Sequence, residues 1–301
     1  MANDSGTVHA SRGLVLGGGG PVGRAWQVGL VDGFADQGID LWTDDLIIGT
    51  SAGAVVGAQL ALKQGFRTPP ETAAAIASAP PPVDPGRMAE LGAAMVRAAQ
   101  SPEPEPIRAG IGKMALNAQT ISEEESLSRS MFAPFVGQAW PNQLRVTSVN
   151  ARTGQLRIWD ASSGAPLERA IAASTAAPCI WPAITIDGER YIDGGVRSTL
   201  NADLAIGCNI VIAVSCFSLT GHDKAGPAFF TAINAAPLAE LDAVRGSGAT
   251  VALIEPRSDF VVLTKRGTAM MDSNLVPEAY RLGQITAAGE AESVRRLWNS
   301  H

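Results

Sequence analysis

Histidine and cysteine are scarce in this chain, which restricts the metal chemistry that it can support. Only three of the 301 residues are histidines and three are cysteines. None of them form the closely spaced pairs that bind zinc. We therefore expect no metal site and no other cofactor. An odd number of cysteines gives no complete disulfide framework, so Cys179, Cys208 and Cys216 are expected to be free thiols in a reducing compartment.

The chain also lacks a long apolar run and a block of basic residues. Its apolar stretches stay below the roughly 18 residues of a membrane span, and residues 1–11 do not have the basic start and apolar run of a secretory signal. The net charge is −6 and no basic cluster can neutralise phosphates, which argues against a nucleic-acid partner. These absences predict a soluble, cytoplasmic protein and leave its oligomeric state open.

Glycine is abundant, and two glycines surround a serine at an informative place. Ser51 stands between Gly49 and Gly53, after the apolar residues 46–48 and before residues 52–62, which are apolar on nearly every side. A nucleophile elbow has this order, because a tight turn from strand to helix exposes the serine hydroxyl at the end of the strand. The pattern also fits an ordinary strand-to-helix turn, but its context favours the elbow.

A second glycine-rich loop precedes the elbow. Residues 17–23 follow a predicted strand at 13–16 and lead into a helix predicted from about Arg24 to Gln37. Four consecutive glycines are costly in chain entropy unless the backbone must approach a ligand. In one interpretation, the loop amides bind the oxyanion that forms when Ser51 attacks an acyl carbon.

The same loop also matches the dinucleotide-binding fingerprint. Gly18, Gly20 and Gly23 have its spacing, but the next predicted strand ends at Ser51 and not in the acid that would bind a ribose. A nucleotide- or anion-binding protein without catalysis is therefore the alternative function. A purely structural turn is the third interpretation, and we favour the oxyanion loop.

Residues 66–119 form a long stretch without strand signals. Prolines separate short helical segments such as residues 87–99. Connections of this kind are often lids or binding loops, and we expect Met88 and Met95 to help cover an acyl site. Helices that simply pack on the core are the other explanation. A capping box beginning at Ser122 predicts a helix that extends to about Phe135.

The remaining pattern predicts an α/β fold with a mainly parallel sheet flanked by helices. There are no internal repeats and no clear linker, so residues 1–301 are expected to form a single domain. Asp193 stands at a predicted strand end, and Gly194 and Gly195 leave room around its carboxylate, although an Asp-Gly turn explains this motif equally well by itself. The predicted strands are residues 144–149, 155–159, 184–186, 190–192, 209–216 and 250–254, and the predicted helices are residues 167–174 and 277–298.

Three motifs in this order resemble those of the patatin-like phospholipases: Gly18 to Gly23, Gly49 to Gly53, and Asp193-Gly194-Gly195. The stretch at 173–178 is similar to that family too. The resemblance covers a catalytic core at about residues 12–205, and residues 206–301 would complete the fold.

The resemblance implies a lipid acyl hydrolase with a Ser-Asp dyad and an acyl-serine intermediate. Ser51 would be the nucleophile, Asp193 the base, and the amides of Gly18, Gly19 and Gly20 the oxyanion hole. The substrate would be a lipid or a small ester, which is compatible with transient contact with a membrane surface. Many members carry Arg or Lys where this chain has Val22, whereas Arg24 lies two positions later.

The chain order also allows a rival to the dyad. Ser51, Asp193 and His222 follow the order of the triad in α/β-hydrolases, in which histidine is the base. Two observations argue against this triad. Ser51 follows only the second predicted strand, and His222 stands in a polar loop at residues 220–224, where a solvated histidine is more common. We therefore expect the dyad.

Overall fold

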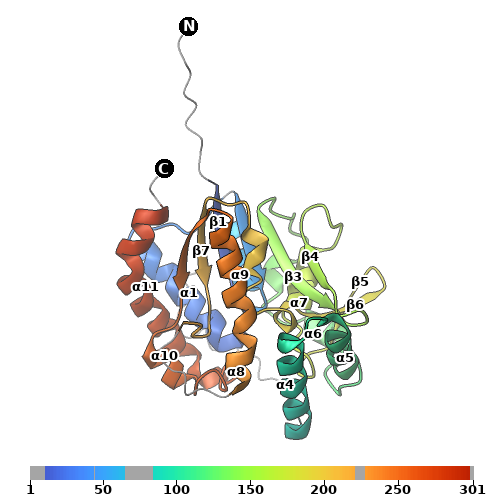
Figure 1. Cartoon of the computed structure of the whole chain (residues 1–301). Helices are drawn as coiled ribbons and strands as arrows, with labels where there is room; N and C mark the ends of the chain where they lie inside the picture. Colours follow the sequence, from blue (N-terminus) through green and yellow to red (C-terminus); the bar gives the residue numbers. More distant parts are fainter. Residues whose placement is uncertain (1–10, 44, 65–83, 221–227, 299–301) are drawn as a thin grey trace.

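One eight-stranded sheet organises the residues that this computed structural model describes, namely 11–43, 45–64, 84–220 and 228–298 (Figure 1). The strand order is β5-β6-β3-β2-β1-β7-β8, and β4 pairs with β3 outside this path. The pairs β3–β2, β2–β1, β1–β7 and β7–β8 are parallel, whereas β3–β4, β3–β6 and β5–β6 are antiparallel. The strands are β1 (Arg12–Leu16), β2 (Leu46–Thr50), β3 (Leu144–Asn150), β4 (Leu156–Trp159), β5 (Ile184–Ile186), β6 (Glu189–Asp193), β7 (Ile210–Val214) and β8 (Thr250–Ile254).

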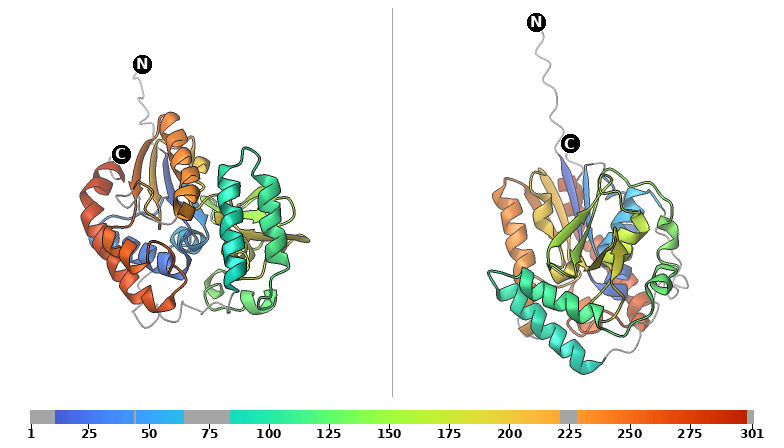
Figure 2. Two further views of the ribbon diagram at one scale, coloured as in Figure 1. Left: turned by 60° about the horizontal axis from the view of Figure 1, so that its bottom comes forward. Right: turned by 90° about the vertical axis from the view of Figure 1, so that its right-hand side faces the viewer.

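Helices cover both faces of the sheet, with α1 and α11 on one face and α9 on the other (Figure 1). In Figure 2, α4 and α5 lie side by side next to the antiparallel end of the sheet, where their apolar residues pack on β3 and β6. The helices are α1 (Gly20–Asp36), α2 (Ala52–Ala61), α4 (Pro85–Gln100), α5 (Glu105–Leu116), α6 (Glu123–Leu127), α7 (Leu167–Ser174), α8 (Ala228–Ile233), α9 (Ala235–Gly246), α10 (Ser258–Leu263) and α11 (Val276–Trp298).

The central strands are apolar throughout because both of their faces are buried. In β1, Leu14 and Leu16 point into the cluster beneath α1 and α11, whereas Val15 points into the cluster beneath α9. Successive side chains of a strand point to opposite faces, so one strand supplies both layers. β7 and β8 extend this sheet beyond the predicted core at 12–205. The predicted α/β fold, with a mainly parallel sheet between helices, is confirmed.

Two predicted helix boundaries are wrong. The helix expected from Arg24 begins at Gly20, inside the glycine loop. Pro21 is compatible with this early start, because proline has no N–H and the N–H groups of a first turn have no partner within the helix. The helix expected to reach Phe135 ends at Leu127. There the Ser128 hydroxyl donates to the Glu125 carbonyl, and such side-chain bonds compete with helix continuation.

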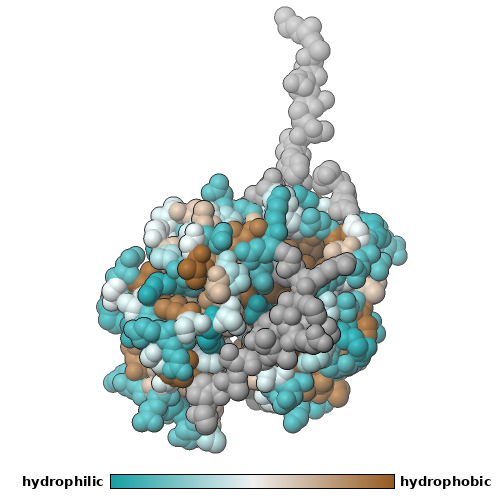
Figure 3. Space-filling view, turned by 180° about the vertical axis from the view of Figure 1, so that it is seen from behind, coloured by the Kyte–Doolittle hydropathy of each residue, from teal (hydrophilic) through white to brown (hydrophobic). Residues whose placement is uncertain are grey.

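Polar and apolar side chains are interspersed on the face seen from behind in Figure 3. Among the described residues, no helix combines the length and the apolar character that crossing a membrane requires.

Candidate active site

Ser51 occupies a strained turn between β2 and α2. Its backbone has φ 54° and ψ −118°, a conformation that costs a non-glycine residue roughly 1–3 kcal/mol. The flanking glycines make this turn feasible, because a Cβ on Gly49 would meet the backbone of Ala54 and a Cβ on Gly53 would meet the Leu16 carbonyl. The turn therefore has the backbone strain and the close packing that a nucleophile elbow requires.

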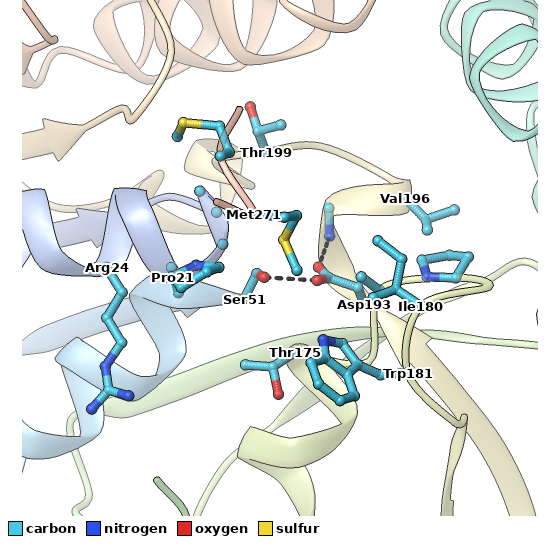
Figure 4. Close-up of a pocket in the computed structure, with 18 of the residues that line it drawn as sticks. Pro21, Arg24, Ser51, Thr175, Ile180, Trp181, Asp193, Val196, Thr199 and Met271 are labelled. Carbon is cyan, nitrogen blue, oxygen red and sulfur yellow. Dashed lines mark hydrogen bonds between the residues drawn. The ribbon is translucent and has the colours of Figure 1, made fainter. Parts of the chain in front are cut away.

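The hydroxyl of Ser51 donates a hydrogen bond to Asp193. The distance from Ser51 Oγ to Asp193 Oδ2 is 2.7 Å (Figure 4). Asp193 is the last residue of β6, which pairs with β3, so two strand ends bring the side chains together. The Gly195 N–H donates to Asp193 Oδ1 at 2.7 Å, and a Cβ on Gly194 would meet Thr147. Both carboxylate oxygens are thus held in place.

Burial gives the Asp193 carboxyl an unusual proton affinity. Only 7% of the residue is exposed. Burial raises its pKa from 3.8 to about 6, and the hydrogen bonds from Ser51 and the Gly195 N–H oppose that rise. At neutral pH the carboxylate is therefore mostly ionised, yet it accepts a proton more readily than an aspartate in water.

The glycine loop lies beside the serine, and two of its amides are free. A Cβ on Gly18 would lie 3.2 Å from Ser51 Cβ. The Gly18 N–H, however, donates to the Thr199 carbonyl at 2.8 Å. This contact corrects the prediction for Gly18, because an N–H that already donates within the protein is not available to an oxyanion. In the part of the chain that the structure describes, the N–H groups of Gly19 and Gly20 have no acceptor.

Two buried residues, Gln27 and Cys216, contact the glycine loop on the side away from the cavity. Gln27, which is completely buried, donates through Nε2 to the Gly17 carbonyl at 2.6 Å and to Cys216 Sγ at 3.0 Å. A Cβ on Gly19 or on Gly23 would clash with Cys216, so these glycines allow the loop to lie against it. This role could not be predicted from the sequence, because Gln27 has the pattern of a polar residue on an exposed helix face.

Further polar side chains tie the elbow to the rest of the sheet. Ser174, at the end of α7, accepts a hydrogen bond from the Ser51 N–H at 2.8 Å. Thr50 Oγ1 lies 2.8 Å from Thr147 Oγ1, and Asn201 donates to Thr50 at 3.0 Å. These residues come from four separate segments, so their contacts could be found only from the fold.

Ser51 and Asp193 line a largely apolar cavity of about 310 Å³. Among the described residues that line it, Asp193 is the only carboxylate. Met88 and Met95 both pack against the core cluster under α4 and α5, but of the two only Met95 is among the described residues that line the cavity. Six of the apolar lining residues are Leu91, Met131, Ile180, Trp181, Phe217 and Met271.

The structure bears differently on the dinucleotide-binding interpretation, on His222 as the base and on the cysteines. β2 itself ends in Thr50, whose hydroxyl lies 2.8 Å from the Thr147 hydroxyl, and not in the acidic residue that the dinucleotide fingerprint requires. His222 lies outside the described residues. All three cysteines are free, and Cys208 is only partly buried.

Comparison with known proteins identifies one family. A model of the family Patatin-like phospholipase matches residues 14–206. No curated protein matches the chain. Among solved structures, the chain is similar to VipD from Legionella pneumophila, with a TM-score of 0.39, 13% identity, and coverage of 93% of this chain and 67% of VipD. It is also similar to the type III effector protein ExoU, with a TM-score of 0.33, 15% identity, and coverage of 92% of this chain and 54% of ExoU.

Proposed function

The chain belongs to the patatin-like phospholipase family, and from that premise we propose that it hydrolyses lipid acyl esters through an acyl-Ser51 intermediate, with Asp193 as the base. The observation that carries the proposal is the 2.7 Å hydrogen bond from Ser51 Oγ to Asp193 Oδ2 at the wall of an apolar cavity. Pairing of a serine with an adjacent base is the general arrangement by which a hydroxyl becomes a nucleophile.

In the first half of the reaction, Asp193 takes the hydroxyl proton while Ser51 Oγ attacks the carbonyl carbon of the ester. The carbonyl oxygen becomes an oxyanion, and the N–H groups of Gly19 and Gly20 are available to bind it. When the tetrahedral intermediate collapses, the bond to the alcohol oxygen breaks. The alcohol leaves with the proton from Asp193, and the acyl group remains on Ser51.

In the second half, water replaces the alcohol. Asp193 takes a proton from the water as its oxygen attacks the acyl-Ser51 ester. The intermediate collapses with cleavage of the bond to Ser51 Oγ, which recovers the proton from Asp193. The fatty acid is released and the resting state is restored. Burial of Asp193 supports both proton transfers, because a carboxylate with a pKa of about 6 accepts a proton far better than one at 3.8.

The oxyanion in this proposal is stabilised by neutral groups. Val22 occupies the position where many family members carry a cation, and its side chain is buried in the core. In Figure 4 the Arg24 side chain points away from Ser51, so it does not replace that cation at the reacting carbonyl. The remaining stabilisation comes from the loop amides and from the amino end of α1, whose peptide dipoles favour negative charge.

Covalent labelling tests the proposal. A fluorophosphonate probe should add one phosphonyl mass to the wild-type protein and none to Ser51→Ala. Ser163→Ala is the matched control, because its hydroxyl bonds only to Asp160, far along the chain from the elbow, and it should be labelled like the wild type. A folded wild-type protein that takes up no label, or a Ser51→Ala variant labelled at the normal rate, would contradict the proposal.

A further inference from the structure

One buried cation in the cavity has no counter-ion among the residues that the structure describes. Arg24 is only 6% exposed and lines the cavity, and its Nε and Nη1 atoms are completely buried without a hydrogen-bond partner among the described residues. Arg24 is the one arginine among the described residues that is almost completely buried. Arg197, by contrast, binds both Asp203 and Glu240. Arg24 therefore differs from the structural ion pairs of this protein.

The isolation of Arg24 has an electrostatic cost. Burial lowers the pKa of its guanidinium to about 10, and it still carries a positive charge at neutral pH. A buried charge without a partner is unfavourable, and an anion that enters the cavity would supply both the missing charge and the missing acceptors. Among the described residues, Nε and Nη1 of Arg24 have no acceptor, and the residue lines the cavity.

A second cation reinforces the positive potential. Arg129 also lines the cavity, where its guanidinium stacks on the Trp181 ring at 3.9 Å and its Nε donates to the Ser126 carbonyl at 3.1 Å. The titratable side chains among the described lining residues are these two arginines and Asp193. The cavity thus carries one net positive charge when Asp193 is ionised, although the whole chain carries a net charge of −6.

The Arg24 guanidinium lies away from the atoms that react at Ser51 (Figure 4). Arg24 follows Gly20 by four residues on α1, so both residues lie on one face of the helix, one turn apart. The Gly20 N–H is one of the two free loop amides, whereas the Arg24 side chain extends away from Ser51 (Figure 4). A substrate whose ester lies at Ser51 could therefore place a second, acidic group at Arg24.

We propose that Arg24 forms an anion subsite, which makes the enzyme selective for esters that carry a second, acidic oxygen group, either carboxylate or phosphate. This inference rests on the proposed function, because the selectivity is measured on Ser51-dependent hydrolysis. The acidic group can belong to the acyl part or to the alcohol part of the ester, and two pairs of substrates distinguish these cases.

Each substrate pair differs only in the acidic group. For the acyl part, the mono-4-nitrophenyl ester of glutaric acid is compared with 4-nitrophenyl pentanoate, which has the same chain length. For the alcohol part, lysophosphatidic acid with an oleoyl chain is compared with monooleoylglycerol. The wild type should hydrolyse the anionic member of at least one pair with the higher kcat/KM.

The Arg24→Met variant should lower the anionic-to-neutral ratio of kcat/KM in that pair by roughly 10- to 100-fold, the effect of one charged hydrogen-bonded contact. Arg24→Lys should keep part of the preference. Arg157→Met is the matched control, because it removes the same charge from an exposed arginine that lies over Trp159, outside the cavity. Both rates come from one protein sample, so the ratio does not depend on the folded fraction.

The outcomes separate the two proposals. If Ser51-dependent hydrolysis occurs but neither pair shows a preference for its anionic member, the subsite is overturned and the proposed function stands. An unchanged ratio in Arg24→Met, or an equal fall in Arg157→Met, also overturns the subsite. If no ester is hydrolysed in a Ser51-dependent manner, both proposals fail.

Discussion

Replacement of Asp193 by Asn should abolish activity and stabilise the protein at the same time. The raised pKa has a direct consequence for folding. Between pH 3.8 and about 6 the folded state binds a proton at Asp193 that the unfolded chain has released, so stability falls as pH rises through this window. Above pH 6 the full cost of burying the charge applies. A pKa displaced from 3.8 to about 6 corresponds to about 3 kcal/mol.

Asparagine removes this charge and preserves most contacts. Its carbonyl oxygen can accept from the Gly195 N–H, as Asp193 Oδ1 does, and its amide group can donate to Ser51 Oγ. Asp193→Asn should therefore be more stable than the wild type by about 1–3 kcal/mol at pH 8, because part of the gain is lost with the charged hydrogen bonds. The difference should shrink towards zero at pH 4. Activity should fall at least roughly a hundredfold, since an amide cannot act as a general base.

Urea unfolding of both proteins at pH 4, 6 and 8 measures the stability difference, and kcat/KM for one neutral ester measures the activity. Other groups that titrate over this range are shared by both proteins and cancel in the difference. A wild type that is at least as stable as Asp193→Asn at pH 8 would show that the carboxylate is not a buried, costly charge. A variant that keeps more than about a tenth of the activity would show that the carboxylate is not the base.

Three further perturbations test neighbouring parts of the reasoning. With a base whose pKa is about 6, kcat/KM should rise about tenfold per pH unit below pH 6 and level off above it. The same profile in His222→Ala favours the dyad, whereas loss of the rising limb would make histidine the base. Gly53→Ala, whose Cβ would meet the Leu16 carbonyl, should lower the Tm and prevent labelling of the elbow, whereas Gly110→Ala, with open space around its Cβ in α5, should leave labelling unchanged and should not lower the Tm. Met95→Asp should weaken hydrolysis of long-chain esters more than of short-chain esters, because Met95 lines the cavity, and Met88→Asp should not show this difference.

Local chain chemistry made most of the secondary structure predictable. Asp187 and Gly188 lie between the two predicted strands at 184–186 and 190–192 and adopt the positive φ angles, 50° and 78°, of a tight hairpin turn. The continuous apolar run at residues 210–214 is a central strand buried on both faces. Helix ends were less predictable, because the start of α1 at Gly20 depends on Pro21 in its first turn and the end of α6 is followed by the Ser128 side-chain bond, and periodicity reveals neither.

The candidate site was predictable only where a motif fixes its own backbone. Ser51 and Asp193 each stand at a strand end with glycines around them, and the sheet register brings these ends together. The partners of the glycine loop come from distant segments. The Thr199 carbonyl accepts a hydrogen bond from the Gly18 N–H, and Cys216 packs against Gly19 and Gly23. Neither residue has a local signal, so their roles depend on the tertiary fold.

A chain with few histidines can still provide a base that titrates near neutral pH if burial raises the pKa of a carboxylate by the right amount. Asp193 is enclosed enough for its pKa to rise to about 6, but the two hydrogen bonds that it accepts keep the ionised form accessible. Without these bonds, the same burial would raise the pKa further and leave the group protonated at neutral pH. With more exposure, the pKa would return towards 3.8 and the carboxylate would be a weak base. The base strength thus follows from the balance between burial and hydrogen bonding, so removal of the Gly195 N–H contact should shift the activity profile to higher pH.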